Sequence, residues 1–92
     1  MRISLGKRFQ QDVRKLSDDD RRAVCDAMLG LPRAIGNPHA HAGLGLRKVH
    51  VSGIWEARVG LGLRLLFALR DDTLTLVRVA THDEVRRFLR EL

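Results

Sequence analysis

Apolar and polar positions in the first third of the chain follow the period of an α-helix. After a short strand candidate at residues 2–5, the stretch 7–16 places apolar residues at i, i+4 and i+7. The stretch 17–31 opens with Ser17, a favoured N-cap residue, and three aspartates that suit a first helical turn. Pro32 is expected to end this second helix. The pattern predicts a helical hairpin with a buried face formed by Phe9, Val13, Leu16, Val24, Ala27, Met28 and Leu31.

The period changes to two after a loop rich in proline and glycine at residues 32–45. Four strand-like runs follow, at residues 46–51, 54–60, 63–70 and 74–80. The turns between them are short, which forces neighbouring strands to run antiparallel. A last set of apolar residues, Val85, Phe88, Leu89 and Leu92, has helical spacing. The expected fold is a single α+β domain over residues 1–92, in the order β-α-α-β-β-β-β-α. It is a twisted, mostly antiparallel sheet with the helical hairpin on one face and a short C-terminal helix.

Strand alternation assigns the polar side chains of these runs to one face of the sheet, because successive residues point to opposite faces. In the first run, Lys48 and His50 share a face, and Val49 and Val51 take the other. The same argument, extended to the end of the fourth run, predicts a polar face lined by Lys48, His50, Glu56, Arg58, Arg64, Arg78 and His82. A solvated side of an antiparallel sheet is the simplest interpretation of such a face.

The charge balance favours a functional interpretation. The chain carries 17 Lys and Arg against 11 Asp and Glu, a formal net charge of +6, which favours an anionic partner. Residues 47–70 contain Arg47, Lys48, Arg58, Arg64 and Arg70, with Glu56 as the single acid before the turn. A basic sheet face suits a phosphate backbone.

Composition excludes several protein classes. A chain of 92 residues with 45% hydrophobic and 30% charged residues is typical of a globular domain and not of a disordered one. No apolar run reaches the ~18 residues of a membrane span, and the first residues lack the apolar segment of a signal peptide. A cytoplasmic location is therefore expected. The single cysteine, Cys25, is expected to be a small buried hydrophobe on the second helix.

The polar face also carries the residue types that cleavage of RNA by its own 2′-hydroxyl requires. A base removes the 2′ proton, a cation stabilises the phosphate, and an acid protonates the leaving 5′ oxygen. His82, His50 and Glu56 are candidates for proton transfer, and Arg58, Arg64 and Arg78 are candidates for phosphate binding. Such a reaction requires no metal. His39 and His41 form an H-x-H pair in the loop, but two histidines fall short of the three or four ligands of a metal site, so no metal or other cofactor is expected.

Several segments together resemble one known family. "FQQDVRKL", "GLGLRKV", "IWEARVGLGLRLLFAL" and "VATHDEVRRFL" are similar, in this order, to the RelE/ParE superfamily, the toxins of bacterial type II toxin–antitoxin pairs. The resemblance covers nearly the whole chain. It implies a compact antiparallel sheet flanked by helices. For the RelE branch it also implies an mRNA endonuclease that inhibits translation, often in the ribosomal A site and without metal.

The resemblance assigns roles to individual residues. Arg64 matches the arginine that contacts the scissile phosphate, and Arg78 and His82 match the "R-x-x-x-H" of histidine-using relatives. Lys48 or His50 falls where other members carry a basic or proton-transferring residue. Phe88 takes the place of a catalytic or base-stacking tyrosine, and this chain contains no tyrosine. The expected RNA-binding residues are Lys48, Arg47, Arg58, Phe88 and Arg86.

The resemblance also implies partners and alternatives. An antitoxin with an acidic, helix-rich tail is expected to bind the basic surface, in a heterotetramer or a larger complex, beside mRNA and the ribosome. ParE toxins share the fold, lack the nuclease residues and inhibit DNA gyrase. A catalytically weak interaction module of the same fold is a third alternative, because fold does not determine function.

Overall fold

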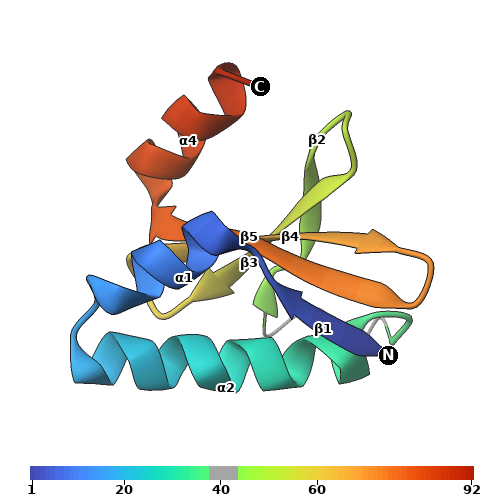
Figure 1. Cartoon of the computed structure of the whole chain (residues 1–92), viewed down its shortest axis with the longest axis horizontal. Helices are drawn as coiled ribbons and strands as arrows, with labels where there is room; N and C mark the ends of the chain where they lie inside the picture. The colour runs from blue at the N-terminus through green and yellow to red at the C-terminus, as the bar shows by residue number, and fades with distance from the viewer. Residues whose placement is uncertain (38–43) are drawn as a thin grey trace.

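The computed structural model describes residues 1–37 and 44–92, so the expected loop pair His39 and His41 lies outside the described residues. The elements follow the predicted order (Figure 1). They are β1 (Arg2–Leu5), α1 (Lys7–Arg14), α2 (Asp18–Ala34), β2 (Arg47–His50), β3 (Ile54–Val59), β4 (Leu63–Arg70), β5 (Thr73–Thr81) and α4 (His82–Arg90). The five strands form one sheet in the order β1-β5-β4-β3-β2, in which β1 runs parallel to β5 and the other neighbours are antiparallel. The predicted fold class is confirmed.

The sheet separates two apolar clusters. The larger cluster lies between the sheet and the helices α1 and α2, and includes Phe9, Val24, Ala27, Leu31, Ala57, Val59, Leu65, Phe67, Leu74, Leu76 and Val79. The smaller cluster lies on the opposite face of the sheet, where Val85 of α4 packs with Ile54, Leu66 and Ala80. Figure 1 shows α2 along one side of the sheet and α4 rising from the other. The face that carries α4 is the one on which the polar side chains were expected.

Three predictions about the helices are wrong. α2 continues through Pro32 to Ala34, and the N–H of its C-cap residue Ile35 still donates to the carbonyl of Leu31 at 2.9 Å, in the helical i to i−4 pattern. Cys25 is exposed, since it follows the buried Val24 and points about 100° away from it around the helix. Leu92 is also exposed, because α4 ends at Arg90. The N-cap prediction is confirmed: the Ser17 hydroxyl accepts a hydrogen bond from Asp20 N–H at 3.2 Å.

A β-bulge in β2 changes which residues line the polar face. Arg47 pairs with Glu56 and Lys48 with Trp55, but His50 then pairs with Ile54, so Val49 is an extra residue. Lys48 therefore lies on the α2 side, with Trp55, and the prediction that it shares the face of Glu56 is wrong. Arg47 takes that place, and Val49 packs against the smaller cluster and not against the helical hairpin.

A second bulge lies in β5. Leu66 pairs with Arg78 and Phe67 with Leu76, which leaves Val77 as the extra residue. The bulge allows Leu76 to face α2 while Arg78, two positions later, faces α4. The expected common face of Arg78, Ala80 and Arg64 is confirmed. β5 ends at Thr81, so strand alternation does not place His82, which begins α4.

Neither α1, α2 nor α4 has the length and hydropathy that a membrane-crossing helix requires, and this finding covers the described residues.

Candidate functional site

On the α4 side of the sheet, three arginines cluster around one buried carboxylate. Arg47 of β2, Glu56 and Arg58 of β3, and Arg64 of β4 line a pocket of about 330 Å³, together with Gly45. The strand register brings them together, because Glu56 pairs with Arg47 and Arg58 pairs with Arg64. Three cations beside one anion give the pocket a net positive charge, which suits an anionic ligand.

Glu56 organises two of these arginines. Its side chain is buried, with 3% of the residue exposed, and its Oε1 accepts a hydrogen bond from Nε of Arg47 at 3.3 Å. The same oxygen lies 3.7 Å from Nε of Arg64. Arg64 is half-buried, and its Nη1 also donates to the carbonyl of Leu63 at 3.0 Å. Arg64 is therefore held by two partners, one on its own strand and one on β3.

Arg58 is exposed and passes close to the backbone of Gly45. Gly45 has φ +60°, in the left-handed region, and a Cβ built there would overlap Nε of Arg58. Arg58 lies directly opposite Arg64 in the antiparallel pair, an arrangement in which like charges repel. Because Glu56 is engaged with Arg47 and Arg64, Arg58 is the cation of this cluster best placed to meet a ligand from solvent.

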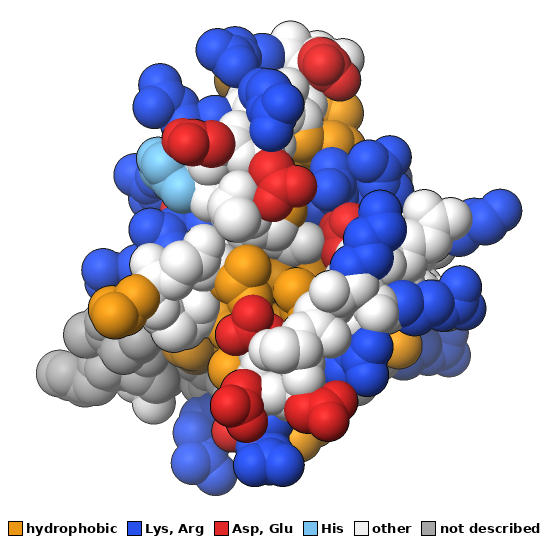
Figure 2. Space-filling view, turned by 90° about the vertical axis from the view of Figure 1, so that its left-hand side faces the viewer, with side chains coloured by type: hydrophobic (Ala, Val, Ile, Leu, Met, Phe, Trp, Pro, Cys, Tyr) orange, Lys and Arg blue, Asp and Glu red, His pale blue; other side chains and the backbone are white. Residues whose placement is uncertain are grey.

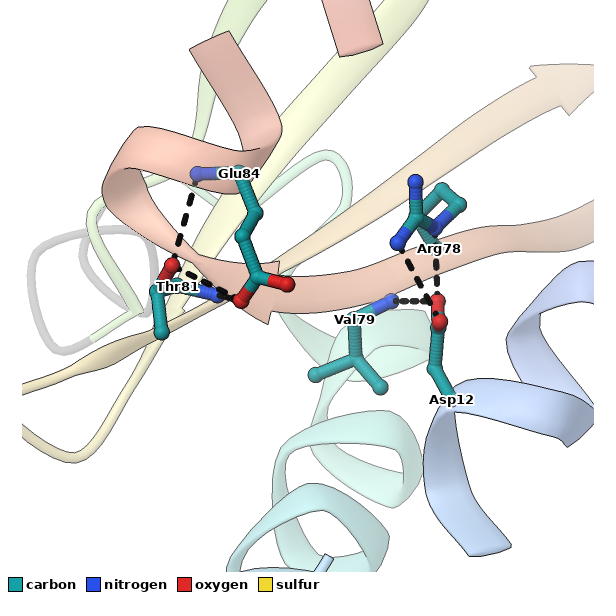
Figure 3. A network of polar contacts seen from close by, with 5 residues as sticks. All are labelled: Asp12, Arg78, Val79, Thr81 and Glu84. Atoms are coloured by element: carbon teal, nitrogen blue, oxygen red, sulfur yellow. Dashed lines mark hydrogen bonds and ion pairs between the residues drawn. The ribbon is translucent and has the colours of Figure 1, made fainter. Parts of the chain in front are cut away.

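Arg78 is bound elsewhere. Its Nε and Nη2 donate to the carboxylate of Asp12 at 2.7 and 3.2 Å, and the N–H of Val79 donates to the same carboxylate at 3.1 Å (Figure 3). Asp12 and Arg78 are each 8% exposed. The structure therefore brings Arg78 onto the expected face but engages it with α1, apart from the Glu56 cluster.

Phe88 packs over Arg78 instead of standing free. Its ring centroid lies 5.2 Å from Cζ of Arg78, a cation–π contact. Phe88 also packs against the smaller apolar cluster. One face of the ring is thus covered by protein.

His82 is exposed at the first position of α4, directly after the N-cap Thr81. The hydroxyl and the N–H of Thr81 both donate to Oε1 of Glu84, at 2.8 and 3.1 Å, and Glu84 N–H donates to the Thr81 hydroxyl at 3.3 Å (Figure 3). The Thr81 hydroxyl bond is the main cause that lowers the pKa of Glu84; the Thr81 backbone bond and the charges of Arg78 and Arg87 act in the same direction. This capping box closes the first turn of α4. Ala80 of β5 lies opposite Arg64 of β4, and His82 comes two residues after Ala80 in the chain.

His50 has a local partner. Its Nδ1 accepts from the N–H of Ser52 at 3.1 Å and lies 2.6 Å from the Ser52 hydroxyl. A backbone N–H can only donate, so Nδ1 is unprotonated in this turn and the proton of the neutral ring is on Nε2. His50 thus stabilises the turn between β2 and β3.

The remaining basic residues lie apart from the Glu56 cluster. Arg86 is exposed on α4, where it lines a shallow depression of about 410 Å³ with Asp83, Arg87 and Arg90. On the side of the molecule shown in Figure 2, basic and acidic side chains lie next to one another around an apolar centre. Within residues 1–37 and 44–92, no three His, Cys, Asp or Glu side chains are grouped as metal ligands.

Sequence reasoning missed Asp12 and Gly45. Asp12 had a visible signal, because it lies three residues after Phe9 and interrupts the apolar stripe of α1. A carboxylate on a buried helix face needs a cationic or N–H partner. Gly45 had no signal beyond its place before a strand.

No family model and no curated protein matches the sequence. Solved structures do match. YafQ from E. coli strain BL21(DE3) superposes with a TM-score of 0.73 and 23% identity, over 92% of this chain and 98% of that chain. The RelB–RelE antitoxin–toxin complex from Methanococcus jannaschii matches with a TM-score of 0.67 and 16% identity, over 92% and 96%. The DinJ–YafQ complex from E. coli matches with a TM-score of 0.63 and 21% identity, over 92% and 98%. The chain therefore has the fold of the RelE and YafQ structures, as the resemblance of its segments implied.

Proposed function

We propose that the protein is the toxin of a type II toxin–antitoxin pair, and that it inhibits translation as a metal-independent, ribosome-dependent mRNA endoribonuclease. The observation that carries the proposal is the arginine cluster around Glu56, on the sheet face from which β5 leads to His82. The fold shared with YafQ and RelE structures supports the toxin assignment.

The proposed reaction is a transesterification within the RNA. The 2′-oxygen attacks the adjacent phosphorus while a base removes its proton, and the bond from phosphorus to the 5′ oxygen breaks. An acid returns a proton to that oxygen, so the products are a 2′,3′-cyclic phosphate and a 5′-hydroxyl. Atoms and charges balance without a metal or a redox partner.

The contacts suggest how this chain divides the work. Arg64 and Arg58 bind the scissile phosphate and stabilise the charge of the transition state. His82, whose side chain is exposed at the start of α4, transfers a proton. Glu56 was expected to transfer a proton, but its engagement by Arg47 and Arg64 favours a positioning role. His50 keeps Nε2 available for proton transfer, and Arg47, Phe88 and Arg86 complete the proposed RNA-binding set. Lys48, which was expected to belong to it, lies on the α2 side of the sheet with Trp55.

The proposed protein partner is an antitoxin with an acidic, helical tail. Two of the matching structures are complexes with RelB and DinJ. The net charge of +6 gives this chain the complementary sign for such a tail. A heterotetramer or larger assembly in the cytoplasm is part of the proposal.

The test is to incubate the purified protein with translating ribosomes in the presence of a chelator and to map mRNA 3′ ends. Wild-type protein is expected to cut mRNA, and His82→Ala and Arg64→Ala are each expected to lower the rate by about 10². Arg70→Ala is the matched control, because Arg70 is an exposed arginine at the other end of β4. Its activity should equal that of the wild type.

The alternatives give different results. Intact mRNA together with impaired DNA gyrase supercoiling would replace the nuclease proposal with the ParE-like one. Intact mRNA and unaffected gyrase would leave an interaction module.

A further inference from the structure

Asp12, Arg78 and Phe88 connect three elements in one line of contacts. Asp12 of α1 binds the guanidinium of Arg78 through two hydrogen bonds, of 2.7 and 3.2 Å. One face of that guanidinium lies over the Phe88 ring of α4, at 5.2 Å from the centroid. The edge and one face of the Arg78 side chain are therefore both occupied by protein groups.

This line bridges a groove. The space between α1 and α4 has a volume of about 450 Å³ and is lined by Arg8 of α1 and by Arg87 and Glu91 of α4. Arg78 and Phe88 also line it. At this groove Arg78 contacts both helices, through Asp12 of α1 and Phe88 of α4.

We propose that Asp12 is a positioning residue, which sets the place of α4 through Arg78 and Phe88 and thereby places His82 relative to Arg64. The proposal rests on the proposed function in so far as His82 acts on RNA. The geometry supports it, because His82 belongs to the same short helix as Phe88, whose ring lies against the Arg78 guanidinium that Asp12 binds. In this proposal Arg78 acts on the helix and not on the phosphate.

The two possible roles of Arg78 predict opposite effects of neutralising Asp12. If Arg78 binds the phosphate, Asp12→Asn releases a cation toward RNA, and KM falls. If Arg78 positions α4, Asp12→Asn weakens the hold on α4, and kcat falls while KM stays the same. A displacement near 1 Å is enough to lower a rate by about 100-fold.

The experiment measures kcat and KM of mRNA cleavage on translating ribosomes for Asp12→Asn. The temperature is one at which circular dichroism shows that the variant is folded. The matched control is Asp26→Asn, an exposed aspartate of α2. We expect kcat to fall about 10-fold to 100-fold for Asp12→Asn with KM within about threefold of the wild type. A second variant, Phe88→Leu, keeps the apolar packing and removes the aromatic ring. In the double variant, Phe88→Leu should lower kcat little beyond the effect of Asp12→Asn alone, because both changes break the same line of contacts.

Two kinetic outcomes overturn the proposal. A lower KM at unchanged kcat would make Arg78 a phosphate ligand. Unchanged kinetics in a folded but less stable Asp12→Asn protein would leave Asp12 a purely stabilising role.

NMR separates this proposal from the proposed function. Two sets of signals are recorded without RNA: the imidazole signals of His82 and the backbone amide signals of α4, His82–Arg90. They are compared between the wild type, Asp12→Asn and Asp26→Asn. We expect these signals to move in Asp12→Asn and to stay in Asp26→Asn. If the wild type fails to cut mRNA, the nuclease proposal is lost, but unmoved signals in Asp12→Asn would still refute, and moved signals would still support, the control of α4 by Asp12.

Discussion

Asp12 and Arg78, 66 residues apart in the chain, form a nine-tenths-buried ion pair between α1 and β5. The pair lies just beyond the end of β1, where the edge of β5 has no neighbouring strand. β1 pairs with β5 only as far as Leu76, and beyond that point the Asp12 carboxylate accepts the N–H of Val79. Two residues further on, Glu84 accepts the N–H of Thr81. Carboxylates from α1 and α4 thus satisfy the donors that a longer β1 would have satisfied.

Removing the Asp12 carboxylate should be among the most destabilising single changes in the chain. Asp12→Ala leaves the buried guanidinium of Arg78 and the N–H of Val79 without their partner, which costs about 3–5 kcal/mol. Urea unfolding at neutral pH measures the loss. Asp26→Ala, at an exposed position of α2, should change the free energy of unfolding by at most about 0.5 kcal/mol. A loss for Asp12→Ala as small as that of the control would show that the ion pair contributes little.

The order of helices and strands could be predicted because each element carries a clear period and ends at a turn residue. The faces of β2 and β5 could be predicted only in part, since each strand contains a bulge and one extra residue reverses the alternation beyond it. Alternation alone would place Leu74, Leu76 and Arg78 on one face. Tertiary packing decides otherwise, because Leu76 belongs to the core and Arg78 to the ion pair with Asp12.

The candidate site was predicted best where strands are regular. Glu56, Arg58 and Arg64 lie on the uninterrupted pair β3–β4, and the structure brings them together. Lys48 lies beyond a bulge and His82 beyond a strand end, so neither position followed from alternation. Long-range partners, such as Asp12 for Arg78, are invisible to periodicity because they depend on how α1 crosses the sheet.

Gly6 makes a close backbone contact that an added methyl group would disturb. A Cβ at Gly6 would lie 2.6 Å from the carbonyl oxygen of Leu76, which accepts the Gly6 N–H at 2.9 Å. Gly6→Ala should therefore destabilise the protein by about 1–3 kcal/mol through overpacking. Gly30 is the control with the opposite sign: it lies inside α2 with open space around its Cα, so Gly30→Ala should stabilise by about 0.5–1 kcal/mol. Thermal unfolding compares the two, and a stabilised Gly6→Ala would contradict the close contact.

The capping box of α4 should make stability depend on acid. Because hydrogen bonds from Thr81 lower the pKa of Glu84 in the folded protein, ionised Glu84 stabilises the fold above its ordinary carboxyl range near ~4.3. This contribution is lost as pH falls through the lowered pKa of the folded state. Thr81→Ala should raise the pKa of Glu84 toward its ordinary value, and should lower the free energy of unfolding at neutral pH by about 1 kcal/mol. An NMR titration of the Glu84 carboxyl in both proteins measures the shift, and equal pKa values would contradict the assigned cause.

Gly45 should matter for RNA binding through Arg58. Gly45→Ala places a methyl group where the guanidinium of Arg58 now lies, so the guanidinium must shift from its present place in the pocket. The loss of one phosphate contact should reduce the slope of log K against log salt by about 0.7 for a single-stranded RNA. Fluorescence anisotropy with an RNA oligonucleotide at several salt concentrations measures that slope.

The control variant Gly60→Ala distinguishes a loss of RNA binding from the effect of backbone strain. Its φ is also +60°, but a Cβ built there meets nothing within 4 Å. Gly45→Ala and Gly60→Ala should therefore share a strain cost of about 1–2 kcal/mol in unfolding experiments. Only Gly45→Ala should change the salt slope. Equal slopes in the two variants would show that Arg58 does not bind the phosphate backbone from its place beside Gly45. The anionic ligand would then have to be assigned to Arg47 and Arg64, the two arginines that pair with Glu56.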